Sequence, residues 1–208
     1  MKILKEKEAE ELLKKEGFPI INGSYADSIQ KCLKEANKLG FPIVLKVVAK
    51  NVIHKSDVGG VILNIKSIDE LKDSYKKLSK IKGFEGVLVQ KQTDGNFLLL
   101  GLKNDNIFGH VIALGTGGIY TEILKDVTFR VCPVNNNDAD QMIKEIKSYQ
   151  ILMGARGNKK SNIKKLSDII VKLSKLTLKY KNIQELDINP LIINDKEAVV
   201  ADARIVLS

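Results

Sequence analysis

The sequence predicts an α+β fold built from two lobes and two β-sheets. Segments with helical spacing of apolar residues are mixed with short β-branched runs, but the two kinds do not alternate strictly. The later strand-like runs are separated by short turn sequences, which is typical of hairpins. These features favour α+β over a doubly wound parallel sheet. We expect a small lobe at residues 1–83 and a larger one at 84–208, with ligand bound in the cleft between them.

Helices are expected where apolar residues recur every three or four positions between capping residues and glycines. The expected helices are residues 5–16, 27–39, 67–81, 138–147 and 163–180, with a short helical turn at 121–125. The helix that starts at Ser67 has a capping box, because Glu70 follows three positions later.

Strands are expected where short β-branched runs lie between turn signals. The expected strands are residues 43–49, 61–65, 87–92, 97–102, 110–114, 127–134, 183–193 and 198–207. A turn is expected at 103–106, and the last two strands form a hairpin through Asn194, Asp195 and Lys196.

The composition, 44% hydrophobic and 28% charged, is that of a globular protein with a substantial core. The net charge of +9 does not predict a nucleic-acid partner, because the lysines are spread over most helices and only three arginines occur. The N-terminus lacks the apolar core of a signal peptide, and no apolar run approaches the roughly 20 residues that span a bilayer. We expect a cytoplasmic protein without membrane contact, whose two distant cysteines stay reduced.

Lys46 lies inside an apolar strand-like run and His54 lies in the polar loop that follows. A buried lysine is costly unless it meets an anion, and phosphate is a frequent partner. The histidine can carry a phosphoryl group or a proton. The alternatives are a lysine pointing outward from an edge strand and an ordinary surface histidine.

The final hairpin carries Asp187 and Asn189 on one strand and Asp202 on the other. With a hairpin centre near 194–195, Asn189 is expected opposite residue 200 and Asp187 opposite Asp202. These oxygen ligands suit Mg²⁺, which keeps water and phosphate oxygens in its shell. The alternative is a hydrogen-bonded turn network.

The glycine-rich segment 115–118 would let backbone amides approach phosphate oxygens, although many tight turns look alike. Glu122, Asp126 and Arg130 follow it, either as catalytic groups or as an ordinary polar strand edge. Residues 90–92 end a strand where main-chain groups would read an adenine edge.

Taken together, these segments resemble the ATP-grasp (beta) subunit of ADP-forming acyl-CoA synthetases of the acetyl-CoA type. The matching stretches occur in the family's order over nearly the whole chain, and the segments at His54 and at 186–191 are the most specific. They are residues 40–46, 54–61, 87–90, 108–109, 115–122, 126, 129–130, 154–157, 186–191 and 202–204.

The resemblance implies an ATP-grasp fold that holds nucleotide between two sheets, and an acid–thiol ligase that works with a separate subunit. The CoA-binding alpha subunit would make an acyl phosphate and pass its phosphoryl group to the beta subunit, usually within an α2β2 complex. The overall reaction would convert acyl-CoA, ADP and phosphate to acid, CoA and ATP. The implied catalytic residues are His54 and Glu122, the nucleotide-binding residues are Lys46, Val89, Gln90, Lys91, Gln92, Gly117 and Gly118, and the Mg²⁺ ligands are Asn189 and Asp202.

The sequence departs from the family at Phe97, which stands where an acidic residue is usual, and at Asn104, which replaces a basic one. Two alternatives therefore stand beside the catalytic subunit. One is a nucleotide-binding assembly subunit without catalysis. The other is a succinate–CoA ligase-like subunit, against which the histidine stretch argues.

Overall fold

The computed structural model describes residues 1–4, 6–50, 52, 55–117, 126–155 and 159–208. The chain divides into two compact units, one formed by residues 21–93 and the other by residues 1–20 together with 94–208. The boundary expected after residue 83 differs from this division at both ends. Strand β5 (Phe84–Lys91) pairs within the sheet of the smaller unit, and β1 (Lys2–Leu4) pairs within the sheet of the larger one. The helical turn expected at 121–125 lies outside the described residues.

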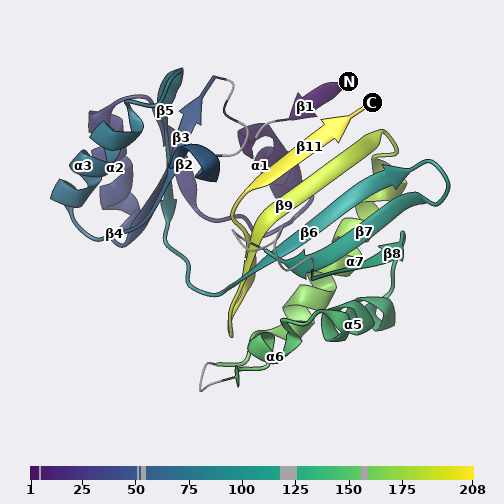
Figure 1. Cartoon of the computed structure of the whole chain (residues 1–208). Helices are drawn as coiled ribbons and strands as arrows, with labels where there is room; N and C mark the ends of the chain where they lie inside the picture. Colours follow the sequence, from purple (N-terminus) through teal and green to yellow (C-terminus); the bar gives the residue numbers. More distant parts are fainter. Residues whose placement is uncertain (5, 51, 53–54, 118–125, 156–158) are drawn as a thin grey trace. The chain divides into compact units, whose positions relative to one another are not determined.

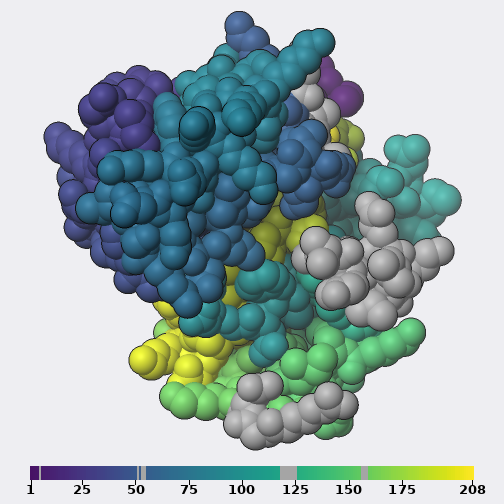
Figure 2. Space-filling view, turned by 60° about the vertical axis from the view of Figure 1, so that its left-hand side comes forward, coloured from purple at the N-terminus to yellow at the C-terminus, as the bar shows by residue number. Residues whose placement is uncertain are grey.

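The smaller unit is a four-stranded sheet with two helices on one face (Figure 1). The strand order is β2-β5-β3-β4, and each pair is antiparallel. Besides β5, its elements are β2 (Gly23–Ala26), α2 (Ile29–Leu39), β3 (Ile43–Ala49), the 3-10 turn η1 (Ser56–Val58), β4 (Val61–Ile65) and α3 (Ile68–Leu78). In the space-filling view these residues, blue-violet to teal, form one continuous body (Figure 2).

The helices of the smaller unit begin at serine N-caps, of which the sequence predicts the one at Ser67. Ser28 accepts a hydrogen bond from the Lys31 amide, and α2 ends at Gly40 with φ 68°. The Ser67 hydroxyl accepts from the Glu70 amide at 3.2 Å, while the Glu70 carboxylate accepts from the Lys66 amide at 2.7 Å. The caps therefore fix where each helix starts, and the apolar faces then pack on the sheet.

The larger unit is a seven-stranded sheet in the order β1-β11-β9-β6-β7-β8, with β10 pairing to β9. All its strand pairs are antiparallel, so the predicted α+β class is confirmed. Besides β1, its elements are α1 (Glu6–Lys15), β6 (Asn96–Asp105), β7 (Gly109–Thr116), β8 (Val127–Val131), α5 (Asn136–Glu145), α6 (Tyr149–Leu152), α7 (Ile163–Lys179), β9 (Ile183–Ile193), β10 (Ala198–Val200) and β11 (Ala203–Leu207).

The large sheet is covered by helices on one face. Alternate residues of β6, namely Leu98, Leu100 and Leu102, are buried against the core that α7 completes with Leu166 and Ile170. Helices α5 and α7 lie on this side of the sheet (Figure 1). In each strand, the residues that alternate with these buried ones point to the opposite face of the sheet, because successive side chains of a strand point to opposite sides. We call this face the open face.

Several predicted boundaries in the larger unit are wrong. The strand expected at 198–207 is two strands, β10 and β11, and the helix expected at 138–147 runs from Asn136 to Glu145. The turn expected at 103–106 lies later, because β6 continues to Asp105, whose Oδ1 accepts from the amides of Ile107 and Phe108 at 2.8 and 3.0 Å. Strand β8 ends at Val131 instead of residue 134, two residues before Pro133, which has no amide to donate to a ladder.

Candidate functional site

Lys46 is buried at the centre of the smaller unit's sheet. Strand β3 lies between β5 and β4, and Lys46 is opposite Leu88 on one side and Val61 on the other. The residue is only 6% exposed. The alternative of a lysine pointing outward from an edge strand is therefore wrong. Burying an ammonium group costs free energy because water is removed from it, and contact with an anionic group offsets that cost.

The predicted adenine-reading residues lie on β5 and just beyond it. The Val89 side chain belongs to the apolar core, and Gln90 is 1% exposed. The backbone amide of Lys91 donates to Asn22 O at 2.9 Å, and that of Gln92 donates to Pro42 O at 3.2 Å. Both amides are thus used within the protein, and a nucleotide would have to be read by other groups of this segment.

The side chains of Lys91 and Gln92 also have partners inside the smaller unit. Lys91 Nζ donates to Gly40 O at 2.8 Å and to Phe41 O at 3.3 Å, at the C-terminal end of α2. The partial negative charge at the C-terminal end of a helix stabilises a cation at this position. Gln92 Oε1 accepts from the Asn64 amide at 3.0 Å. These contacts stabilise the fold, so a nucleotide would compete with them for the two side chains.

His54, Gly118 and Glu122 lie outside the described residues, but both ends of the segment around His54 are attached to neighbouring strands. The Lys50 amide donates to Gly83 O at 2.9 Å. On the other side, the Gly60 amide donates to Lys55 O at 2.7 Å, and Gly60 O accepts from Val47 at 2.7 Å. Lys50, Lys55 and Gly60, which are described residues near His54 in the chain, are thus hydrogen-bonded within the unit that carries Lys46.

The hairpin register differs from the expectation in a way that improves the candidate metal site. Residue 203 pairs with 188 and residue 198 with 193, so Asn189 lies opposite Asp202, whose carbonyl accepts from the Asn189 amide at 3.1 Å. Asp187 instead lies opposite Arg204. The expectation was wrong because the hairpin is centred one residue later, between 195 and 196, where the turn is closed by an Asn194 N–H donation to Glu197 O at 3.0 Å.

The donors at this hairpin fit a magnesium ion. Within the described residues, no three His, Cys, Asp or Glu side chains gather as a ready-made metal cage. An amide oxygen from Asn189 and a carboxylate from Asp202 are hard oxygen ligands on facing residues. Mg²⁺ is commonly held by one or two protein groups, with water and phosphate oxygens completing its shell. The chemistry of the donor set therefore agrees with the metal implied by the sequence.

Gly117 lies at the same end of the large sheet as the Asn189–Asp202 pair. Its amide donates to Phe97 O at 2.9 Å, and a Cβ at this position would lie 2.5 Å from the carbonyl carbon of Leu98. Leu98 in turn pairs with Leu191 of β9. Glycine is required here because the backbone packs directly on β6. This packing explains the glycine without any contact to phosphate.

Asp126 and Arg130 have structural partners that the sequence did not reveal. The Asp126 carboxylate accepts from Thr116 Oγ1, Lys147 N and Ser148 N at 2.7, 2.6 and 3.0 Å. Burial raises the pKa of Asp126, but these hydrogen bonds outweigh it, and the pKa lies below its usual value. Arg130 pairs with Glu145 of α5.

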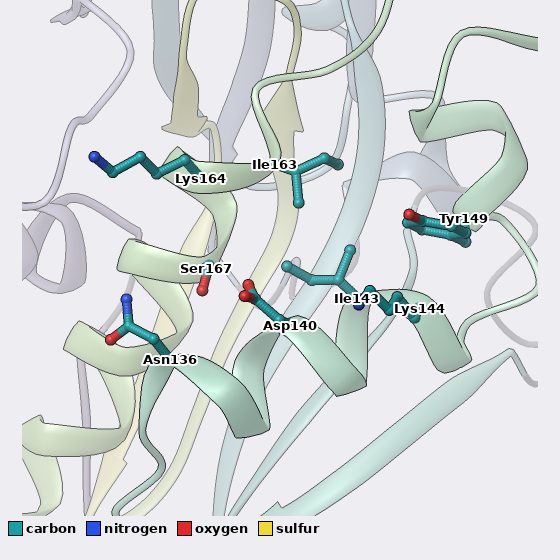
Figure 3. A pocket seen from close by; sticks show the side chains of 8 residues that line it. All are labelled: Asn136, Asp140, Ile143, Lys144, Tyr149, Ile163, Lys164 and Ser167. Carbon is teal, nitrogen blue, oxygen red and sulfur yellow. The ribbon is translucent and has the colours of Figure 1, made fainter.

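The described part of the larger unit contains at least two cavities. One of about 270 Å³ between α5, α6 and α7 is lined by Asn136, Asp140 and Ser167 among others (Figure 3). It contains none of the predicted site residues. A second, of about 490 Å³, lies on the open face of the sheet and includes Asp187, Phe108 and Phe129. Its lining residue Asp187 lies on β9 two positions before Asn189, so both side chains belong to the same face of the sheet.

A family model described as an ATP-grasp domain matches residues 1–207, which defines the class of this protein. The chain is 40% identical over 212 residues to the Pyrococcus furiosus "Acetate--CoA ligase [ADP-forming] I subunit beta", covering 98% of this chain and 91% of the relative. It is 39% identical to the Archaeoglobus fulgidus "Acetate--CoA ligase [ADP-forming] II", covering 99% of this chain but only 30% of that relative.

A solved structure of Ca. Korarchaeum cryptofilum dinucleotide forming acetyl-coenzyme A synthetase 1 superimposes with a TM-score of 0.85 at 36% identity, covering 100% of this chain and 93% of that one. That structure contains coenzyme A and Mg-AMPPCP, and its phosphohistidine segment points towards the nucleotide binding site. The chain belongs to the family of beta subunits of ADP-forming acetate–CoA ligases.

No helix within the described ranges has both the length and the apolar content needed to cross a membrane.

Proposed function

We propose that this chain is the phosphoryl-transferring beta subunit of an ADP-forming acyl-CoA synthetase. The observation that carries the proposal is the match over 98% of the chain to a relative named as such a beta subunit. The buried Lys46 in one unit and the facing Asn189 and Asp202 in the other agree with nucleotide and metal binding.

In the proposed reaction, His54 carries a phosphoryl group received from the partner subunit. A β-phosphate oxygen of ADP attacks that phosphorus, the P–N bond breaks, and the imidazole is released as ATP forms. Lys46 would contact the phosphate oxygens, and Gly117 and Gly118 would offer backbone to them. Asn189 and Asp202 would hold Mg²⁺, which when bound neutralises phosphate charge during transfer. Glu122 would act beside the nucleotide.

The acyl and CoA chemistry would belong to an alpha subunit. The relative named as a beta subunit has nearly the length of this chain, whereas the Archaeoglobus relative carries the matching region in 30% of a longer chain. Both arrangements are consistent with a domain that works beside further protein. An α2β2 assembly and a cytoplasmic location are part of this proposal.

The second candidate is an assembly subunit that binds nucleotide without catalysis, and Phe97 is the observation that favours it. Phe97 is 36% exposed on β6, where the family resemblance leads us to expect an acidic residue. The carbonyl of Phe97 accepts a hydrogen bond from the Gly117 amide, so this backbone contact of the site does not depend on the side chain at position 97. We favour the catalytic subunit for that reason.

The affinity of the Lys46→Met variant for Mg²⁺–ADP tests the proposal. Loss of a buried charge-assisted contact to phosphate should weaken Mg²⁺–ADP binding about 10-fold or more by calorimetry. Lys38→Met removes one charge from the same unit at an exposed lysine that pairs with Glu35, and it should bind like the unmodified chain. Equal affinity for the two variants would contradict the role of Lys46.

A further inference from the structure

The cavity of about 270 Å³ between α5, α6 and α7 contains a buried hydroxyl that the fold does not use (Figure 3). Ser167 of α7 is 3% exposed, and its Oγ has no hydrogen-bond partner within the described chain. The other two buried hydroxyls of this helix differ, because Ser174 Oγ donates to Val171 O at 2.8 Å and Thr177 Oγ1 donates to Ser174 O at 2.7 Å. A buried polar group without a partner costs free energy, so Ser167 is expected to have a partner in the cavity.

A carboxylate lies beside this hydroxyl. Asp140 follows Asn136 by four positions on α5, so both side chains lie on the helix face that meets Ser167 (Figure 3). None of the described residues forms a hydrogen bond or an ion pair with the Asp140 carboxylate. Carboxylate and hydroxyl oxygens together suit a group with several N–H donors, and a primary ammonium has three.

Two lysines add the opposite charge to the same cavity. Lys144 lies one helical turn beyond Asp140, and residues at this spacing on a helix often form an ion pair. Within the described part of the chain, neither Lys144 nor Lys164 has such a partner. Figure 3 shows the Lys164 side chain extending away from Asp140. The cavity can therefore bind a cationic group at the carboxylate and an anionic group at a lysine.

The rest of the wall is apolar and limits the size of a ligand. Ile143 is fully buried in the core, and Ile163 and Tyr149 pack against that core. A volume of about 270 Å³ is slightly below the roughly 300–1,000 Å³ of pockets that bind drug-sized molecules. It is also far more than a single water molecule needs. A small molecule with a short apolar side chain fits these limits.

We propose that this cavity binds a small zwitterion, namely an α-amino acid with an apolar side chain. The ammonium of the ligand donates to Asp140 and Ser167, and its carboxylate accepts from Lys144 or Lys164. Its side chain lies against the apolar wall. The lining contains none of the residues proposed for phosphoryl transfer, so the inference does not depend on the proposed function.

Calorimetry with the full chain compares three probes of similar shape. They are L-leucine, 3-methylbutylamine, which lacks the carboxylate, and 4-methylpentanoate, which lacks the ammonium. L-Leucine should bind with a Kd of about 1 mM or below, and each of the other probes at least about 10-fold more weakly, because each loses one set of charge-assisted hydrogen bonds. Equal affinity for either of these probes would overturn the inference. So would the absence of saturable L-leucine binding, which would leave ordered water as the partner of Ser167.

Variants locate the binding in the cavity. Asp140→Asn should weaken L-leucine binding about 10-fold, and Ser167→Ala about 3-fold or more. Asp73→Asn is the matched control, because Asp73 is an exposed aspartate on α3 of the smaller unit, and it should bind like the unmodified chain. The Tm of each variant verifies that it is folded. An unchanged Kd in folded Asp140→Asn, or an equal loss in Asp73→Asn, would overturn the inference.

Discussion

Single residues in this molecule differ in whether their polar groups are satisfied, and that difference has measurable consequences. Within the described residues, Lys46 and Asp126 are the two charged side chains that are buried. The three donors to Asp126 account for its burial, and the buried ammonium of Lys46 suits the contact with phosphate that the proposed function gives it. Two buried serines of α7 differ in whether their hydroxyls are hydrogen-bonded.

Ser167→Ala and Ser174→Ala should differ in stability although both serines are buried on α7. Ser174 Oγ accepts from the Val134 amide at 3.1 Å, so its loss leaves a buried donor unpaired and should cost about 1–3 kcal/mol. Ser167 Oγ has no hydrogen-bond partner within the described chain and faces the cavity beside Asp140 (Figure 3). Its removal should change the free energy of unfolding by less than about 0.5 kcal/mol.

Urea denaturation of the two variants at one pH measures this difference. Equal losses would mean that the Ser167 hydroxyl is bonded in solution, for example to an ordered water in the cavity.

Among the elements, those defined by local patterns were predictable and those defined by distant contacts were not. The helix start at Ser67 follows from its capping box, and the burial of Lys46 follows from its apolar neighbours. The facing of Asn189 and Asp202 was missed by two positions, because the hairpin is centred one residue later than expected and moving the centre by one residue shifts each pairing partner by two. The Asp126 network was missed because its donors lie about twenty residues further along the chain.

Asp126 also gives the β8–α5 region a defined dependence on pH. Its pKa is lower in the folded chain than its usual value of 3.8, so its ionised form stabilises the fold above that pH. That contribution is lost as pH falls through the lowered folded pKa. The stability difference between the unmodified chain and Asp126→Asn should therefore stay constant from pH 7 to about 5 and shrink below about pH 4.

Chemical denaturation of both proteins at pH 7, 5, 4 and 3 measures that difference. A difference that grows as pH falls would mean that the Asp126 pKa is raised in the folded state.

At the scale of the whole molecule, the sequence predicted the fold class and the family but not the division of the chain. Residues 1–20 belong with the larger unit because Lys2 pairs with Leu207, a contact between the ends of the chain that no periodicity reveals. The predicted site residues are split between the two units, with Lys46 and Gln90 in one and Gly117, Asn189 and Asp202 in the other. Phosphoryl transfer would require both units, so the catalytic claim concerns the entire chain.

That claim is tested most directly by incubating the purified chain with Mg²⁺ and γ-labelled ATP and measuring acid-labile, base-stable label on the protein. We expect label on the unmodified chain, none on His54→Ala, and a strong reduction on Asp202→Ala, since transfer needs both the carrier imidazole and the metal ligand. Label retained by His54→Ala would contradict it. So would the absence of label from a chain that binds ATP and is supplied with an alpha subunit, and the non-catalytic assembly subunit would then be the better description.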